Sequence, residues 1–131
     1  MLRSIWPAWI DWALLGGWMG LIFYWSNQVN PSVPGIDFDP LRKSLHVLEY
    51  MLLFWLWRRA IYARWGRDSF AIARIALALT VAYAISDEIH QHFVGRDGNA
   101  RDVLIDAAMP VVLVVILWAR RRTARPTPVY P

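Results

Sequence analysis

Residues 70–96 read FAIARIALALTVAYAISDEIHQHFVGR, an apolar segment that ends in a cluster of ionisable side chains. The part up to Ile85 is long enough to form most of a membrane span. The part that follows holds the adjacent carboxylates of Asp87 and Glu88, two imidazoles, an amide and the guanidinium of Arg96. Ionisable groups at or below a bilayer interface are costly and rare, so this cluster predicts a functional site.

Composition indicates an integral membrane protein rather than a soluble domain. Of the 131 residues, 57% are hydrophobic, 15% are aromatic and 18% are charged, and the apolar residues fall in long blocks. The net charge of +4 does not indicate nucleic-acid binding, because the arginines lie in short clusters between apolar blocks. The chain has no cysteine, which excludes disulfides and thiolate metal sites.

Hydropathy predicts an all-α fold, a polytopic membrane four-helix bundle. The expected spans are residues 5–25, 45–62, 70–93 and 103–119, each close to the roughly 20 helical residues that cross a bilayer core. They form one transmembrane domain over residues 1–125, and the tail 126–131 is expected to be disordered. Pro110 is expected to kink the fourth span.

The distribution of basic residues predicts the orientation in the membrane. One side of the expected spans carries the larger basic group, which is Arg3, Arg58, Arg59, Arg64, Arg67, Arg120, Arg121, Arg122 and Arg125. The other side carries the smaller group, which is Arg42, Lys43, Arg96 and Arg101. The positive-inside rule therefore places both termini in the cytoplasm. Asp11 and Arg74 are then expected near the cytoplasmic face, in interface or inter-helix pairs.

Polar residues from three spans are expected to point to one region near the outer leaflet. His46, Glu49, Asp87 and Glu88 are the candidates for acid–base catalysis, since paired carboxylates and imidazoles can exchange protons. The candidates for substrate binding are Lys43, Tyr50, Gln91, Arg96, Arg101, Asp102 and Asp106. Within the second and third spans, helical spacing puts these residues on shared stripes.

Metal binding and purely structural roles are the competing interpretations of these residues. They include nitrogen and oxygen donors for a divalent ion, but no strong ligand motif such as HExxH identifies a metal or a cofactor. His46 and Glu49 also fit an i,i+3 pair that only ties the second span to its neighbours. Asp87 or Glu88 also fits an ion pair with Arg96 or Arg101 that fixes helix register.

Three segments, 43–50 (KSLHVLEY), 86–96 (SDEIHQHFVGR) and 101–106 (RDVLID), resemble the VanZ-like family of small bacterial integral membrane proteins. The resemblance covers essentially the whole chain and implies a multi-pass protein of the bacterial inner (cytoplasmic) membrane. The founding member of the family is associated with low-level resistance to teicoplanin, a glycopeptide that binds cell-wall precursors outside the membrane. The chain departs from the family pattern at Asp106, where asparagine is usual, and before Arg96, where a proline is often present.

Three functions are compatible with this pattern. The favoured one is a cell-envelope protein whose polar outer-leaflet pocket binds the anionic headgroup of a lipid-linked molecule or a wall precursor. The second is a membrane enzyme, a hydrolase or transferase with or without a metal, that acts on a lipid-linked phosphate. The third is an ion-coupled transporter, which four short spans disfavour. The expected partners are the lipid bilayer and such a headgroup, and the sequence does not indicate an oligomeric state.

Overall fold

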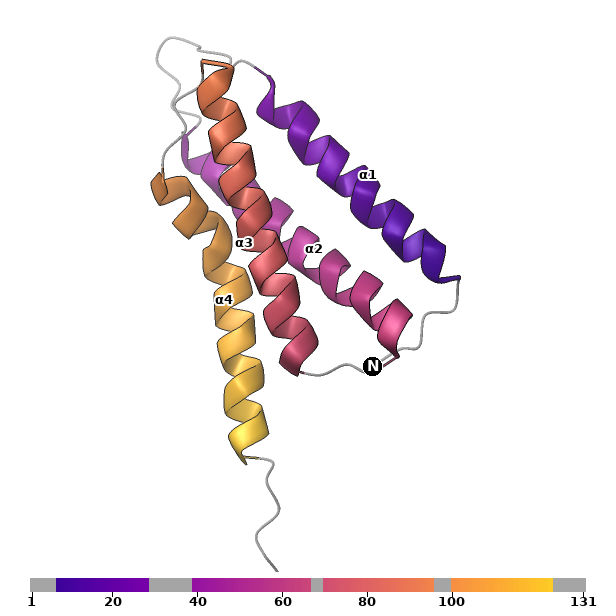
Figure 1. Cartoon of the computed structure of the whole chain (residues 1–131). Coiled ribbons are helices and arrows are strands. Elements are labelled where there is room, and N and C mark those ends of the chain that lie inside the picture. The colour runs from indigo at the N-terminus through magenta and orange to yellow at the C-terminus, as the bar shows by residue number, and fades with distance from the viewer. Residues whose placement is uncertain (1–6, 29–38, 67–69, 96–99, 124–131) are drawn as a thin grey trace, which may run out of the picture.

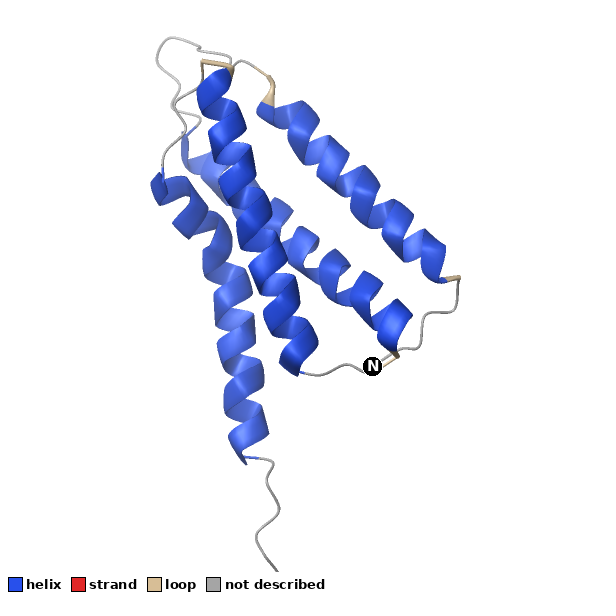
Figure 2. Ribbon diagram, in the orientation of Figure 1, coloured by secondary structure: helices blue, strands red, loops and turns tan. Residues whose placement is uncertain are grey.

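The chain is all-α within residues 7–28, 39–66, 70–95 and 100–123, which are the residues that the computed structural model describes (Figures 1 and 2). Its four helices are α1 (Ala8–Ser26), α2 (Asp39–Trp65), α3 (Phe70–Phe93) and α4 (Ala100–Thr123). The predicted all-α class is therefore confirmed for this part of the chain. The expected tail 126–131 and Arg96 lie outside the described residues, as do the side chains of residues 39–43, 100 and 102.

Consecutive helices run in opposite directions, so the bundle has two chemically different ends (Figure 1). The end of α1, the start of α2, the end of α3 and the start of α4 meet at the upper end of the view, which we call the polar end. The opposite end, with the arginine-rich termini of α2 and α4, is the basic end. Helices α2 and α3 are central, and each contacts the other three helices.

Two helices are long and apolar enough to cross a membrane, namely α3 and the Val103–Thr123 part of α4. Helix α1 is rich in tryptophan and glycine, and α2 carries several charged residues. Large apolar side chains are exposed on all four helices, including Trp9, Leu48, Ile89 and Leu104. Soluble proteins rarely expose apolar surface so widely, whereas a lipid-facing surface requires it.

Helix α3 has the bounds that hydropathy predicts for the third span, whereas α2 and α4 extend beyond their expected spans. Helix α2 begins at Asp39 and α4 at Ala100, because backbone hydrogen bonding continues into polar residues that hydropathy does not count. Pro110 lies inside α4. Proline cannot donate to the carbonyl of Asp106 four residues earlier, and Figure 1 shows the first turns of α4 inclined to the rest of the helix.

The apolar core lies between the two ends and fixes how the helices approach one another. Tyr50 and Leu53 of α2 are fully buried against Ile22 of α1, and Phe54 packs with Ala73 and other buried residues of α3. The buried residues of α3 include three alanines (Ala73, Ala76 and Ala84). Small side chains let helix backbones come close, which favours packing where lipid replaces water outside.

A partly buried ion pair joins α1 to α2 in the half of the bundle nearer the basic end. The Nε atom of Arg59 donates to Oδ1 of Asp11 at 2.5 Å, and the Asp11 side chain is fully buried. Beside this pair, Trp12 packs edge-to-face on Trp57, with ring centroids 6.3 Å apart. The inter-helix pairing predicted for Asp11 is confirmed.

Candidate functional site

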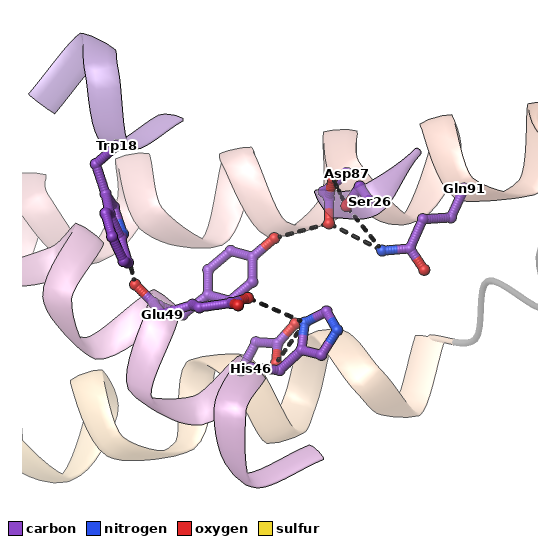
Figure 3. Close-up of polar contacts among 8 residues, drawn as sticks. Trp18, Ser26, His46, Glu49, Asp87 and Gln91 are labelled. Atoms are coloured by element: carbon purple, nitrogen blue, oxygen red, sulfur yellow. Dashed lines mark hydrogen bonds and ion pairs between the residues drawn. The ribbon is translucent and has the colours of Figure 1, made fainter. Parts of the chain in front are cut away.

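Asp87 is the centre of a buried hydrogen-bond network at the polar end, shown in Figure 3. Ser26 of α1 donates its hydroxyl to Oδ1 of Asp87 at 2.5 Å. Tyr50 of α2 and Gln91 of α3 donate to Oδ2 at 3.2 and 2.9 Å. The Gln91 amide also donates to the Ser26 hydroxyl oxygen at 3.2 Å. The four residues, called the Asp87 network below, are all buried.

The Asp87 network ties three helices together through one carboxylate. Its donors are two hydroxyls and an amide, which are neutral groups, so the network differs from the arginine ion pair that sequence reasoning offered as the structural alternative. A carboxylate that accepts several hydrogen bonds is stabilised in its buried position. Asp87 therefore positions Ser26, Tyr50 and Gln91 relative to one another.

A second polar group joins α2 to α4. Nδ1 of His46 lies 3.8 Å from Oε2 of Glu49 and 4.0 Å from Oδ1 of Asp106. The Asp106 side chain is 2% exposed, whereas His46 and Glu49 are partly exposed. These three residues, called the His46 group below, are close enough for electrostatic attraction, but both distances exceed those of a hydrogen bond. The imidazole therefore lies near two carboxylates, and its Nδ1 is hydrogen-bonded to neither.

Tyr50 connects the Asp87 network to the His46 group. Its ring lies almost parallel to the His46 ring, at 12° with centroids 6.4 Å apart, while its hydroxyl donates to Asp87. The structure thus brings together six of the residues predicted from sequence, which are His46, Glu49, Tyr50, Asp87, Gln91 and Asp106.

Of the other predicted site residues, two have a side chain that the structure describes. Glu88 is buried next to Asp87 in α3, and Arg101 is exposed in the first turn of α4. Lys43 and Asp102 belong to α2 and α4, but their side chains are outside the described set, and Arg96 is outside it altogether.

Sequence reasoning missed the contribution of α1. Besides Ser26, Trp18 donates its indole N–H to the backbone oxygen of Glu49 at 3.0 Å (Figure 3). Asn27 Oδ1 lies 2.8 Å from Nε2 of His90, and the Tyr83 hydroxyl donates to the Met19 carbonyl at 2.6 Å. The available signal was the polar run Ser26-Asn27-Gln28 at the end of an apolar segment that reaches the polar end.

The arrangement offers acid–base and hydrogen-bonding chemistry. An imidazole beside two carboxylates can take up or release a proton, and the carboxylate oxygens can accept hydrogen bonds from a ligand. Among the described residues, no group of three or more histidine, cysteine or acidic side chains is arranged to hold a metal ion.

Comparison with known proteins gives a family. Residues 10–121 match the family model described as VanZ/LLP1, which covers most of the chain. No curated protein and no solved structure matches the chain. The family match agrees with the resemblance of segments 43–50, 86–96 and 101–106, and the two apolar helices agree with a membrane location. The chain therefore belongs to the VanZ/LLP1 family and is a helical membrane protein of that family.

Proposed function

We propose that this protein is a four-span protein of the bacterial cytoplasmic membrane that binds the headgroup of a lipid-linked cell-envelope molecule at its polar end. The observation that carries the proposal is the meeting of buried and partly buried polar side chains from all four helices at that end. Ser26 comes from α1, Tyr50 and His46 from α2, Asp87 from α3 and Asp106 from α4. Buried polar groups in a membrane bundle are costly, which favours a functional reason for their presence.

The charges indicate which parts of a headgroup would fit. The His46 group is rich in carboxylate oxygens, which accept hydrogen bonds from the hydroxyl, amide or amine groups of a sugar or amino-sugar. The exposed guanidinium of Arg101, in the first turn of α4, suits a phosphate or pyrophosphate. The proposed ligand is therefore an anionic lipid-linked headgroup with phosphate at the rim and hydrogen-bond donors inside.

The proposal requires that the polar end face outward and that both termini be cytoplasmic. The arginine-rich ends of α2 and α4 support this orientation through the positive-inside rule. We expect a reporter enzyme that is active only outside the cytoplasm to be inactive when fused after Pro131. A cysteine introduced at the exposed Asn27 should react with a membrane-impermeant thiol reagent in intact spheroplasts, and one at the exposed Arg64 should not. The reverse labelling would contradict the orientation.

Headgroup binding is tested with purified protein and undecaprenyl-type phosphate and pyrophosphate lipids. We expect binding in native mass spectrometry, and His46→Ala should weaken it at least about tenfold because the imidazole lies between two carboxylates. His92→Ala is the matched control, since His92 is an exposed histidine in the last turn of α3, which also lies at the polar end. Equal affinity in both variants, or no binding of either lipid by the unchanged protein, would contradict the proposal.

Catalysis at the same site is the second candidate function, and the flanking of His46 by two carboxylates is what favours it. An imidazole that lies close to carboxylates can act as a general base or acid on a phosphate ester. The lipids from the binding experiment are then analysed for cleaved product. Turnover that is lost in His46→Ala and kept in His92→Ala would establish an enzyme, whereas binding without turnover would leave the binding function.

A further inference from the structure

We propose that the basic end carries a separate binding site for an anionic phospholipid, formed by Arg74 of α3 and Arg121 of α4. Both guanidinium groups lie against the same aromatic ring, that of Phe70, with their central carbons 5.7 and 5.8 Å from the ring centroid. Both arginines are exposed. Phe70 is the first residue of α3, so the positive end of that helix dipole also lies at this surface.

The shared ring explains how two like charges are kept together. A guanidinium attracted to the face of an aromatic ring keeps its N–H groups available, and these can hold a phosphate bidentately. Because Arg74 and Arg121 contact the same ring from adjacent helices, that ring limits the distance between their guanidinium groups. An anion close to both would offset their mutual repulsion, so the pair favours a phosphate group.

The charged side chains that the structure describes near this surface are mainly basic. Arg122 stacks on Trp118 at 3.9 Å, close to Arg121 in the last turns of α4. Within the described residues of this half of the bundle, the acidic side chain is Asp11, which contacts Arg59. Arg74 and Arg121 form no ion pair with any side chain that the structure describes there. A negatively charged partner is therefore favoured.

A phospholipid fits this surface better than a soluble anion because apolar side chains adjoin the arginines. Ile75 is exposed next to Arg74, and Val115, Ile116 and Trp118 are exposed one to two turns before Arg121. Acyl chains can lie on these side chains while the phosphate meets the guanidinium pair, and an exposed tryptophan is typical of the interface level. This site is at the opposite end from the proposed headgroup site and does not depend on it.

The test titrates the purified full chain with phosphatidylglycerol and with phosphatidylcholine and follows bound lipid by native mass spectrometry. We expect the unchanged protein to prefer phosphatidylglycerol. The double variant Arg74→Gln/Arg121→Gln should lose about tenfold or more of that affinity, since each arginine near a charged lipid surface contributes several-fold. Phe70→Leu keeps an apolar side chain but removes the ring, and it should lose part of the affinity.

The matched control is Arg64→Gln/Arg120→Gln, which removes the same charge at the same end from exposed arginines for which no contact with Phe70 is found. An equal loss in this control would show that diffuse charge, not the Phe70 pair, attracts the lipid, and would overturn the proposal. Competition by inorganic phosphate at millimolar concentration would point to a soluble anion and would also overturn it. Unchanged thermal stability of each variant in detergent excludes misfolding as the cause.

Discussion

Replacing Asp87 with alanine is expected to lower the free energy of unfolding by about 3 kcal/mol or more and to abolish headgroup binding. The substitution leaves the hydroxyls of Ser26 and Tyr50 and the amide of Gln91 buried without their acceptor. Each buried donor left unsatisfied costs about 1–3 kcal/mol, although relaxation recovers part of that sum. Binding is lost because Tyr50, which lies beside His46, is no longer fixed.

Reversible unfolding of the purified protein in mixed detergent micelles measures this change in the free energy of unfolding.

Ser26→Ala and Ser86→Ala form a matched pair that separates the effect of the Asp87 network from general effects of substitution. Ser26 donates to Asp87, whereas the exposed Ser86 donates only to the backbone of Tyr83 in its own helix. We expect Ser26→Ala to lower the free energy of unfolding by about 1 kcal/mol and Ser86→Ala to leave it almost unchanged. An Asp87→Ala protein as stable as the unchanged one would contradict a structural role of the carboxylate.

The second large effect is expected from replacing Arg59 with alanine, which should lower the free energy of unfolding by about 3–5 kcal/mol. The change removes the guanidinium that contacts the fully buried Asp11 carboxylate, and breaking one side of a buried ion pair costs this much because the remaining charge stays in a poor environment. Stacking of Arg59 on Trp55, at 5.1 Å, is lost as well. The same micelle unfolding experiment measures the change.

A double variant tests the physical cause of the Arg59 effect. Asp11→Asn/Arg59→Gln removes both charges while keeping polar side chains of similar size, and it should recover most of the stability lost in Arg59→Ala. Arg64→Ala is the control, since Arg64 is exposed in the last turn of α2. A double variant as unstable as Arg59→Ala would show that packing of the Arg59 stem, not the charge of Asp11, carries the effect. The headgroup site at the other end should bind lipid normally in the double variant.

Hydropathy alone was enough to find the elements of this fold. The third span was predicted at 70–93 and α3 has those bounds, although its apolar run ends at Ile85 and its last turns are polar. The expected starts of the second and fourth spans came later in the sequence than the starts of α2 and α4, at Asp39 and Ala100. Hydropathy measures transfer from water, and helical hydrogen bonding does not stop where the apolar residues do.

Helical periodicity also placed the polar residues on the correct faces of their own helices. His46, Glu49 and Tyr50 share a stripe of α2, and Asp87 and Gln91 share one of α3, where the Gln91 amide donates to Asp87. The sequence also predicted an interface or inter-helix pairing for Asp11, and Asp11 pairs with Arg59 of another helix. These results follow from the geometry of single helices, in which residues three and four apart are neighbours.

What the sequence could not give was the partner of each polar side chain across the bundle. Asp87 accepts from Ser26 and Tyr50, which come from other helices, and Asp106 lies beside His46 of α2. Such pairings depend on the rotation, depth and inclination of each helix. Those quantities are set by the buried contacts of Tyr50, Leu53 and the small alanines of α3, and by Pro110 in α4. Periodicity fixes the face of one helix, and only packing against its neighbours decides what that face meets.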